Sequence, residues 1–313
     1  MKKILSLVLL VAMLALALVG CGNKDNGPDN TPSEKEYTLS IAVDNAAKGA
    51  KITNTAVALV IDADGKIVAC RLDCAEVSVK LDGEEISTVD RVTTKVELGD
   101  AYTGMPAGSF EQQAKAFEQY VIGKTAAEIE ALDLALVTGC TMASTGPVFK
   151  SIIAKAFAYE RKVSFKTTGT ISLGLAIDSA LKGSVADGNV TVSADFAAAA
   201  LVDGKVVAGI IDSNERKAAV AVETVDGAAT LTVTPADYAG SKNEQGDAYD
   251  AYQPMPAGRW YQQAQAFANT AVGKTAAEVA ELTVDKDALT QVGCSIYAGG
   301  YKAALVRAVG YAR

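Results

Sequence analysis

The hydrophobic and polar positions divide the chain into an apolar start, a short polar segment and a long remainder. Residues 4–19 are almost entirely apolar and follow a basic start, whereas residues 22–36 contain no hydrophobic side chain. The apolar stretch has the length of a signal-peptide core and falls short of a comfortable membrane span. The polar segment cannot bury a core, so it predicts a flexible tether before the folded part.

The remainder shows strand patterns at the start of each half. Two apolar runs flank an Asp-Gly turn in both places, at residues 56–61 and 67–70 around Asp64-Gly65, and at residues 197–202 and 206–211 around Asp203-Gly204. Such a pattern predicts a β-hairpin. A further strand is expected at residues 75–81 and at residues 218–222.

Helical patterns follow the strands in each half. In residues 109–122 the apolar positions Phe110, Ala114, Phe117 and Val121 have helical spacing, and Gly123 marks the end of the helix. Thr125 and Glu128 have the spacing of a capping box that begins a second helix. A last helix is expected at residues 147–159 in the first half and at residues 300–311 in the second.

Several segments recur in the same order in both halves, which indicates a duplication. The matched segments are 99–102 with 246–249, 105–108 with 255–258, 112–117 with 262–267, 123–128 with 273–278, and 139–141 with 293–295. A period of about 150 residues is too long for a solenoid repeat. The sequence therefore predicts two tandem homologous domains of class α+β, at residues 37–162 and 163–313, each an antiparallel sheet with about three helices.

The end of the apolar stretch, Leu18-Val19-Gly20-Cys21, resembles the lipobox of bacterial lipoproteins. The resemblance implies removal of residues 1–20 as a signal peptide, acylation of Cys21, and a tether over residues 21–36. Two or three acyl chains, such as palmitate, hold a protein firmly to the extracytoplasmic face of the cell membrane. The alternatives are an ordinary secretory signal and an uncleaved anchor, and the small residue before Cys21 argues against both.

Charge and composition exclude several classes of function. The formal net charge of −8 disfavours nucleic acids and anionic lipid surfaces as partners. The chain contains no histidine, which excludes Ser-His-Asp and Cys-His catalytic sites and histidine-liganded metal sites. No nucleophile–base pair is visible, so no catalytic residue and no metal ligand is assigned, and an enzyme is the least supported class.

The cysteines of the folded part are expected to be structural. In an extended strand Cys70 and Cys74 would lie more than about 12 Å apart, too far for a disulfide bond. We expect them to be small buried residues near a strand end. Cys140 and Cys294 occupy equivalent Gly-Cys-Thr and Gly-Cys-Ser segments, where a tight turn with a buried cysteine is the simpler interpretation.

Aromatic residues gather in the second half, at Tyr249, Tyr252, Trp260, Tyr261, Tyr297 and Tyr301. Two interpretations remain open. They would form either a binding face for a flat ring or a sugar, or a half-buried domain surface.

The order of hairpin, helices, Gly-x-Thr turn and terminal helix resembles the FMN-binding domain of bacterial electron-transfer lipoproteins. In that family a turn of the form Asp-x-x-Ser/Thr-Gly-Ala-Thr-x-Ser carries FMN on the threonine that follows the alanine. The resemblance implies Thr141 as the acceptor within Thr138-Gly139-Cys140-Thr141, and Ser295 within Val292-Gly293-Cys294-Ser295. Cysteine replaces the alanine of the motif in both copies, and its aspartate would fall at Ala135 and Leu289.

Two functions of different class therefore stay open. The first is a membrane-anchored electron carrier with FMN at Thr141 or Ser295, where the flavin supplies the chemistry for a redox partner. Its FMN turns include Gly139 and Gly293. The second is a flavin-less surface binding lipoprotein that kept the fold, which the altered motif favours.

Overall fold

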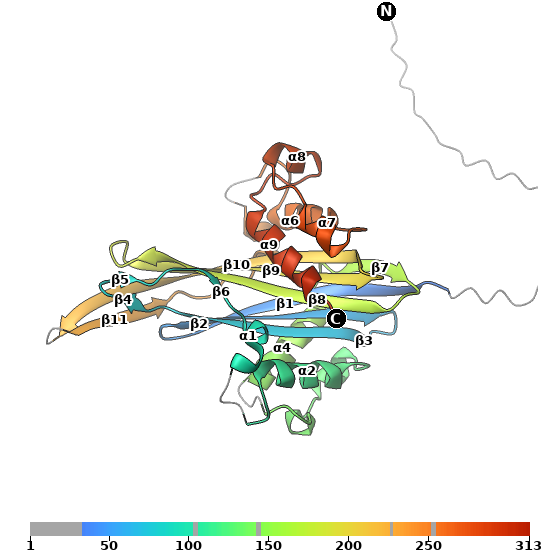
Figure 1. Ribbon diagram of the computed structural model, residues 1–313, viewed down its shortest axis with the longest axis horizontal. Coiled ribbons are helices and arrows are strands. Elements are labelled where there is room, and N and C mark those ends of the chain that lie inside the picture. The colour runs from blue at the N-terminus through green and yellow to red at the C-terminus, as the bar shows by residue number, and fades with distance from the viewer. Residues whose placement is uncertain (1–32, 103–105, 142–144, 226–227, 252–254) are drawn as a thin grey trace, which may run out of the picture. The chain divides into compact units, whose positions relative to one another are not determined.

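Two antiparallel sheets stacked face to face form the centre of the structure (Figure 1). The computed structural model describes residues 33–102, 106–141, 145–225, 228–251 and 255–313, so Cys21 and most of the expected tether lie outside the described residues. The first sheet has the order β3-β2-β1-β7, with β1 (Lys35–Lys48), β2 (Lys51–Asp62), β3 (Ile67–Ser78) and β7 (Val163–Thr167). The second has the order β11-β10-β9-β8-β6, with β6 (Val89–Val92), β8 (Ile171–Ser184), β9 (Asn189–Val202), β10 (Lys205–Val225) and β11 (Ala228–Pro235). The short strands β4 (Leu81–Asp82) and β5 (Glu85–Ile86) pair with each other.

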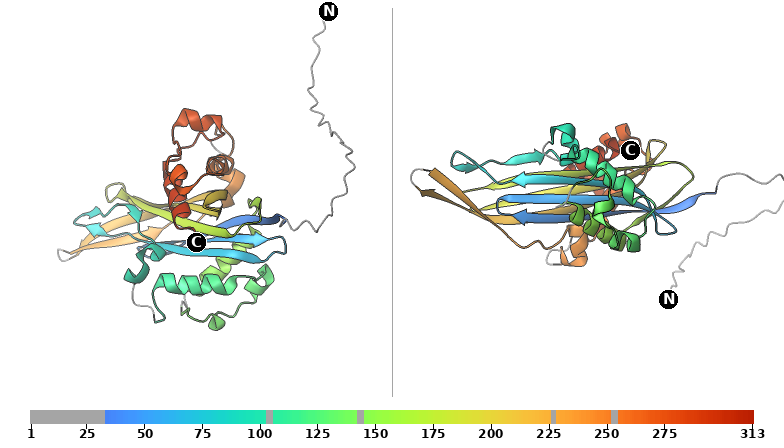
Figure 2. Two further views of the ribbon diagram at one scale, coloured as in Figure 1. Left: turned by 45° about the vertical axis from the view of Figure 1, so that its right-hand side comes forward. Right: turned by 90° about the horizontal axis from the view of Figure 1, so that it is seen from below.

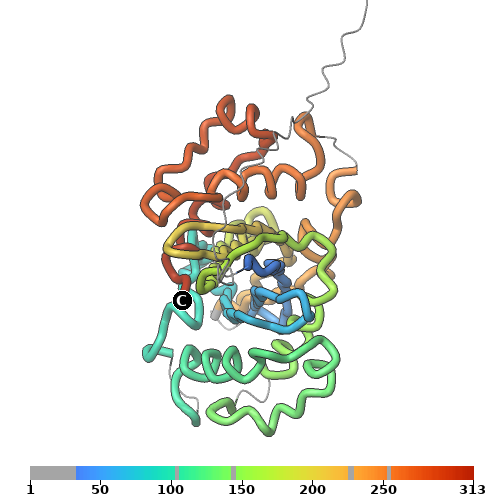
Figure 3. The backbone as a smooth tube through the Cα atoms, turned by 90° about the vertical axis from the view of Figure 1, so that its right-hand side faces the viewer, coloured from blue at the N-terminus to red at the C-terminus, as the bar shows by residue number. Residues whose placement is uncertain are grey.

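Helices cover the outer face of each sheet, which gives four layers in the order helix, sheet, sheet, helix (Figures 2 and 3). The first sheet is covered by the segment that contains α1 (Lys95–Leu98), η1 (Gly99–Ala101), α2 (Phe110–Val121), α3 (Ala126–Glu130), η2 (Leu134–Leu136) and α4 (Thr145–Ala158). The second is covered by the segment that contains α5 (Lys242–Gln245), η3 (Gly246–Ala248), α6 (Trp260–Asn269), α7 (Ala276–Ala280), α8 (Lys286–Gln291) and α9 (Gly299–Gly310). The expected α+β class with antiparallel sheets is confirmed.

The layering explains why the central strands are apolar on both faces. In β9, Ala197, Ala199 and Leu201 pack under the helices of the second half. The alternate residues Phe196 and Ala198 face the other sheet in the core between the two sheets. A strand buried on both faces has a continuous apolar sequence instead of an alternating one.

Small residues let α9 lie directly on its sheet. A Cβ atom at Gly174 of β8 would lie 1.7 Å from the backbone oxygen of Ala308 in α9. Any side chain at Gly174 would therefore push the helix away from the strand. The alanines of β9 serve the same close packing under this helix.

Both expected hairpins are confirmed, but the expected third strands are not separate. Asp203 and Gly204 have positive φ angles of 51° and 74°, and they join β9 to β10. Residues 75–81 and 218–222 were expected as new strands, and they largely continue β3 and β10 without a break. The strands extend past the helices because Val77 and Ala218 enter a second apolar cluster between the sheets.

The tether ends earlier than the sequence predicts. It was expected to reach Glu36, but Lys35 and Glu36 already pair with Thr167 and Lys166 in the first sheet. Polar side chains on a strand do not prevent its backbone from pairing, so composition alone placed this boundary too late.

The two halves share their sheets. Strand β7 comes after residue 162 but pairs with β1 of the first half, whereas β6 comes from the first half and pairs with β8 of the second. Residues Glu34–Arg313 form one compact unit. The division into repeats at residues 162 and 163 stays a prediction, and neither half keeps a sheet to itself.

The main helices begin and end close to their expected positions. Helix α2 begins after Ser109, and the capping boxes of Thr125 with Glu128 and Thr275 with Glu278 are both present. The sequence missed the one-turn helices α1 and α5. Among the described residues, no helix has the length and apolar character needed to cross a bilayer.

Candidate functional site

Thr141 lies in the turn before α4 and is bound to a buried glutamine of α2. The Oε1 atom of Gln113 accepts hydrogen bonds from the backbone N of Thr141 at 2.7 Å and from its Oγ1 at 3.1 Å. The Nε2 atom of Gln113 donates to the backbone oxygen of Gly108 at 3.1 Å. Gln113 has no exposed surface. One buried amide thus joins the turn before α4 to the segment that precedes α2.

Ser295 is held in the same way in the second half. The Oε1 atom of Gln263 accepts from the backbone N of Ser295 at 2.6 Å and from its Oγ at 2.8 Å. The Nε2 atom of Gln263 donates to the backbone oxygen of Gly258 at 2.8 Å. We call each of these arrangements a glutamine clamp. The clamp accounts for the recurrence of the Gly-Cys-Thr/Ser and Gln-Gln segments in both halves.

The glycines of the two turns are required by backbone conformation. Gly139 and Gly293 have φ angles of 78° and 85°, in the left-handed region that favours glycine. An added Cβ atom would lie 3.5 Å from Ala116 and 3.7 Å from Ala266, which is ordinary contact. These glycines therefore set the turn, and no ligand is needed to explain them.

The described residues around the two hydroxyls do not fit a phosphoester-linked FMN. Esterification of Thr141 would remove the proton that its hydroxyl donates to Gln113, and it would place an anionic phosphate beside the carbonyl oxygen of that amide. The same holds for Ser295 and Gln263. The side chain of Thr141 is exposed, but none of the three cavities described below is lined by Thr141 or Ser295.

Three of the four cysteines of the described residues are buried thiols with a raised pKa. No disulfide bond joins any of Cys70, Cys74, Cys140 and Cys294, and all but Cys140 are buried. Burial raises the pKa of Cys70 well above its usual value, raises that of Cys74 to about 12, and also raises that of Cys294. A protonated thiol is a poor nucleophile and metal ligand. Within the described part of the chain, no group of three or more acidic, cysteine or histidine side chains is placed to hold a metal ion.

Two buried aspartates tie a short helix to each sheet. Oδ1 of Asp73 accepts from the backbone N of Val96 at 3.1 Å, and Oδ1 of Asp212 accepts from the backbone N of Asn243 at 3.1 Å. Oδ2 of Asp212 also accepts from the hydroxyl of Ser241 at 2.6 Å. Burial raises the pKa of each aspartate to about 7, although these hydrogen bonds oppose the shift.

A buried lysine sits among aromatic rings in the second half. The Nζ atom of Lys242 lies 5.1 Å from the ring centre of Tyr249 and 5.4 Å from that of Trp260, and it forms an ion pair with Glu215 at 3.1 Å. The indole N of Trp260 donates to the hydroxyl of Tyr301 at 3.2 Å. These aromatic residues therefore stabilise an interior cation.

The first half repeats this arrangement with different rings. The Nζ atom of Lys95 lies 5.0 Å from the ring centre of Tyr102 and 5.3 Å from that of Phe110, and 3.0 Å from Glu76. Lys95 and Lys242 are both buried. The sequence carries this match in residues 73–76 with 212–215 and 94–97 with 241–244, and aligning these segments would have found both the aspartates and the lysines.

The aromatic residues of the second half do not form one binding face. Three of the six are occupied around Lys242, as described above. Tyr297 is exposed over 84% of its surface, Tyr261 lines a cavity, and Tyr252 lies outside the described residues. A half-buried surface is thus the better description, except at Tyr261.

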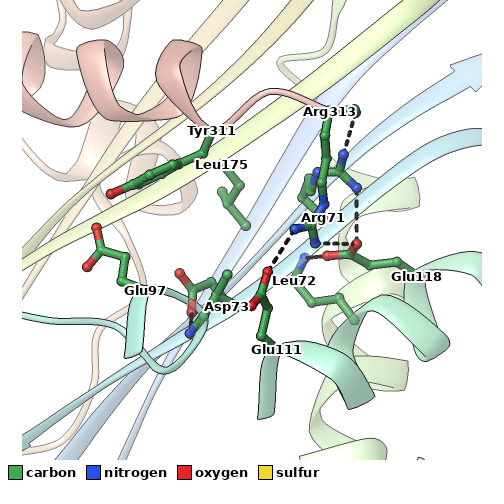
Figure 4. Close-up of a pocket in the computed structure, with 10 residues that line it drawn as sticks. Arg71, Leu72, Asp73, Glu97, Glu111, Glu118, Leu175, Tyr311 and Arg313 are labelled. Carbon is green, nitrogen blue, oxygen red and sulfur yellow. Dashed lines mark hydrogen bonds and ion pairs between the residues drawn. The ribbon is translucent and has the colours of Figure 1, made fainter. Parts of the chain in front are cut away.

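Ion pairs fill the cavity region of the first half (Figure 4). Glu118 of α2 is 4% exposed and pairs with Arg71 at 3.0 Å and with Arg313 at 3.1 Å, and it accepts from the backbone N of Leu72 at 3.0 Å. Arg313 also pairs with Glu111 at 3.2 Å. Burial raises the pKa of Glu118, while the two arginines act in the opposite direction. The adjoining cavities have volumes of about 230 and 380 Å³.

The second half has a cavity of about 370 Å³ in the corresponding place. Its walls come from β10, the start of α5, helix α6 and the connection after α4. The side chains include Arg161, Tyr261, Gln265 and Asn269. Charged side chains at the cavities of the first half pair with one another, whereas the polar side chains that line this cavity form no ion pairs with described residues. This cavity is therefore the candidate binding site.

Comparison with the models of known protein families gives no match, and searches of curated proteins and of solved structures give none either.

Proposed function

We propose that this chain is an extracytoplasmic lipoprotein, held at the cell membrane through acylated Cys21, whose folded part binds a ligand and carries no covalent flavin. The glutamine clamps are the observation that supports this proposal. Because Gln113 and Gln263 engage the hydroxyls of Thr141 and Ser295 in the same way, a structural role explains both residues. A binding role fits a fold in which burial raises the pKa of Cys70, Cys74 and Cys294, and a chain that has no histidine.

An electron carrier is the second candidate, because Thr141 is exposed and accessible to a modifying enzyme. In that case FMN would supply the redox chemistry and a redox partner would supply electrons. The altered turn and the carbonyl oxygen of Gln113 beside the hydroxyl weigh against it.

Flavin content distinguishes the two candidates. The full chain is produced in a bacterial host together with a flavin transferase and a known flavinylated domain as positive control. We expect no fluorescent band on a denaturing gel for the wild type, as for Thr141→Ala and Ser295→Ala. A fluorescent wild-type band that disappears in Thr141→Ala would overturn the proposal.

The anchor is tested separately by fractionation. Replacement of Cys21 by alanine removes the acylated thiol, so the chain should leave the membrane fraction. Equal membrane retention of Cys21→Ala and the wild type would contradict lipid attachment at this residue.

A further inference from the structure

The cavity of the second half is lined by an arginine, Arg161, that forms no ion pair with any described residue. Nη1 of Arg161 donates to the backbone oxygen of Asn243 at 2.7 Å, and its guanidinium lies 4.2 Å from the ring centre of Tyr261. Within the described part of the chain, no carboxylate forms an ion pair with Arg161 or with the adjacent Lys162, whose Nζ donates to a backbone oxygen. Two positive charges therefore line this cavity, and none of its lining residues is a carboxylate.

Arg313 corresponds in position to Arg161, and it forms ion pairs with acidic residues of α2. Arg161 lies three residues after the end of α4, and Arg313 lies three residues after the end of α9. Arg313 reaches across to α2 and pairs with Glu111 and Glu118. Near Arg161, helix α6 has Tyr261 and Ala268 at the positions that match Glu111 and Glu118 of α2.

The wall of the cavity offers neutral hydrogen-bonding groups. Nε2 of Gln265 donates to the backbone oxygen of Gly209 at 3.0 Å and to Oδ1 of Asn269 at 2.8 Å. Among the described residues, Oε1 of Gln265 and Nδ2 of Asn269 have no hydrogen-bond partner. They present one acceptor and one donor on the same helix. The hydroxyl of Tyr261 donates to Asp247 at 3.1 Å, which fixes the ring beneath Arg161.

We propose that this cavity binds an acidic monosaccharide, with its carboxylate on Arg161 and its hydroxyls on the amides of Gln265 and Asn269. This proposal rests on the proposed binding function and adds the ligand class. One N–H of Nη1 already donates to Asn243, and the remaining N–H groups of the planar guanidinium are suited to a carboxylate. Amide side chains pair with hydroxyl groups as donor and acceptor at once. A volume of about 370 Å³ is at the small end of ligand pockets, which favours one sugar ring over an oligomer.

Calorimetric titration of the full chain in detergent tests the proposal, with D-glucuronate, D-galacturonate and N-acetylneuraminate as probes and with D-glucose and acetate as controls. We expect at least one acidic sugar to bind the wild type more tightly than either control. Arg161→Gln should weaken that binding about tenfold or more. The matched variant Arg313→Gln should leave it unchanged, because the guanidinium of Arg313 lies against Glu111 and Glu118 of α2 and does not line this cavity.

Asn269→Ala provides a second test if Arg161→Gln does not fold. Asn269 is an exposed residue at the C-terminal end of α6, so its replacement should leave the fold intact. It should weaken the same sugar severalfold while circular dichroism stays that of the wild type. Binding of none of the three acidic sugars, equal binding of D-glucose or acetate, or equal losses in the Arg161 and Arg313 variants would overturn the proposal. A flavin-free protein that binds no acidic sugar loses this ligand class alone, whereas a flavinylated protein loses the proposed function.

Discussion

Replacement of Gln113 by methionine tests the glutamine clamp most sharply. Methionine has a similar shape and keeps the buried volume, so the variant mainly removes hydrogen bonds. The loss affects the backbone N and the hydroxyl of Thr141 and the backbone oxygen of Gly108. Each buried polar group left without a partner costs about 1–3 kcal/mol, but Thr141 is exposed enough for water to replace part of the loss. We expect the free energy of unfolding to fall by about 2–4 kcal/mol.

Urea denaturation followed by circular dichroism measures this change. Gln119→Met on the same helix is the matched control, because the side chain of Gln119 is exposed and makes no hydrogen bond with any described residue. The control should change the free energy of unfolding by less than about 0.5 kcal/mol. Gln263→Met should reproduce the effect of Gln113→Met in the second half. If Gln113→Met were as mild as Gln119→Met, the clamp would not be what holds Thr141.

Three further predictions concern the buried charges and the helix caps. Burial raises the pKa of Asp212 to about 7, above its unfolded value near 3.9, so its contribution to stability is complete below about pH 4 and is lost as the pH rises through about 7. Urea titrations between about pH 4 and about pH 7 should show that the free energy of unfolding declines less for Asp212→Asn than for the wild type, with a difference of at most about 4 kcal/mol. Equal declines for the two proteins would contradict a raised pKa of Asp212. Arg71→Met removes one of the two arginines that pair with buried Glu118, and it should lower the free energy of unfolding by about 3 kcal/mol in urea denaturation. An unchanged free energy of unfolding would show that water screens this ion pair. Thr275→Ala removes the cap of α7 and should cost about 1 kcal/mol, whereas an unchanged midpoint in thermal denaturation would show that the cap is unimportant.

Short-range patterns in the sequence were sufficient to predict the hairpin turns and the main helices. The Asp-Gly turns, the helical spacing in α2 and the two capping boxes each depend on residues close together in the chain, and the structure has them where they were expected. The long-range features were not accessible in this way. Nothing local indicates that β6 and β7 pair with strands of the opposite half, because strand pairing depends on the whole sheet.

The candidate site was predicted only in part. The Gly-Cys-Thr/Ser turns were found because they recur. Gln113 lies three residues after Phe110 and four before Phe117, so helical spacing also places it on the buried face of α2. Its contact with Thr141 depends on the tertiary fold and is not visible in the sequence. The cavity at Arg161 depends on a connection folding back on a helix that lies about 100 residues later in the chain, and sequence spacing does not show such contacts.

The intact mass of the protein purified from its native membrane reports on lipid attachment and flavin content together. We expect a chain that begins at Cys21, carries acyl groups, and has no mass increment for FMN. A mass that includes one FMN, located by peptide mapping at Thr141 or Ser295, would contradict this expectation.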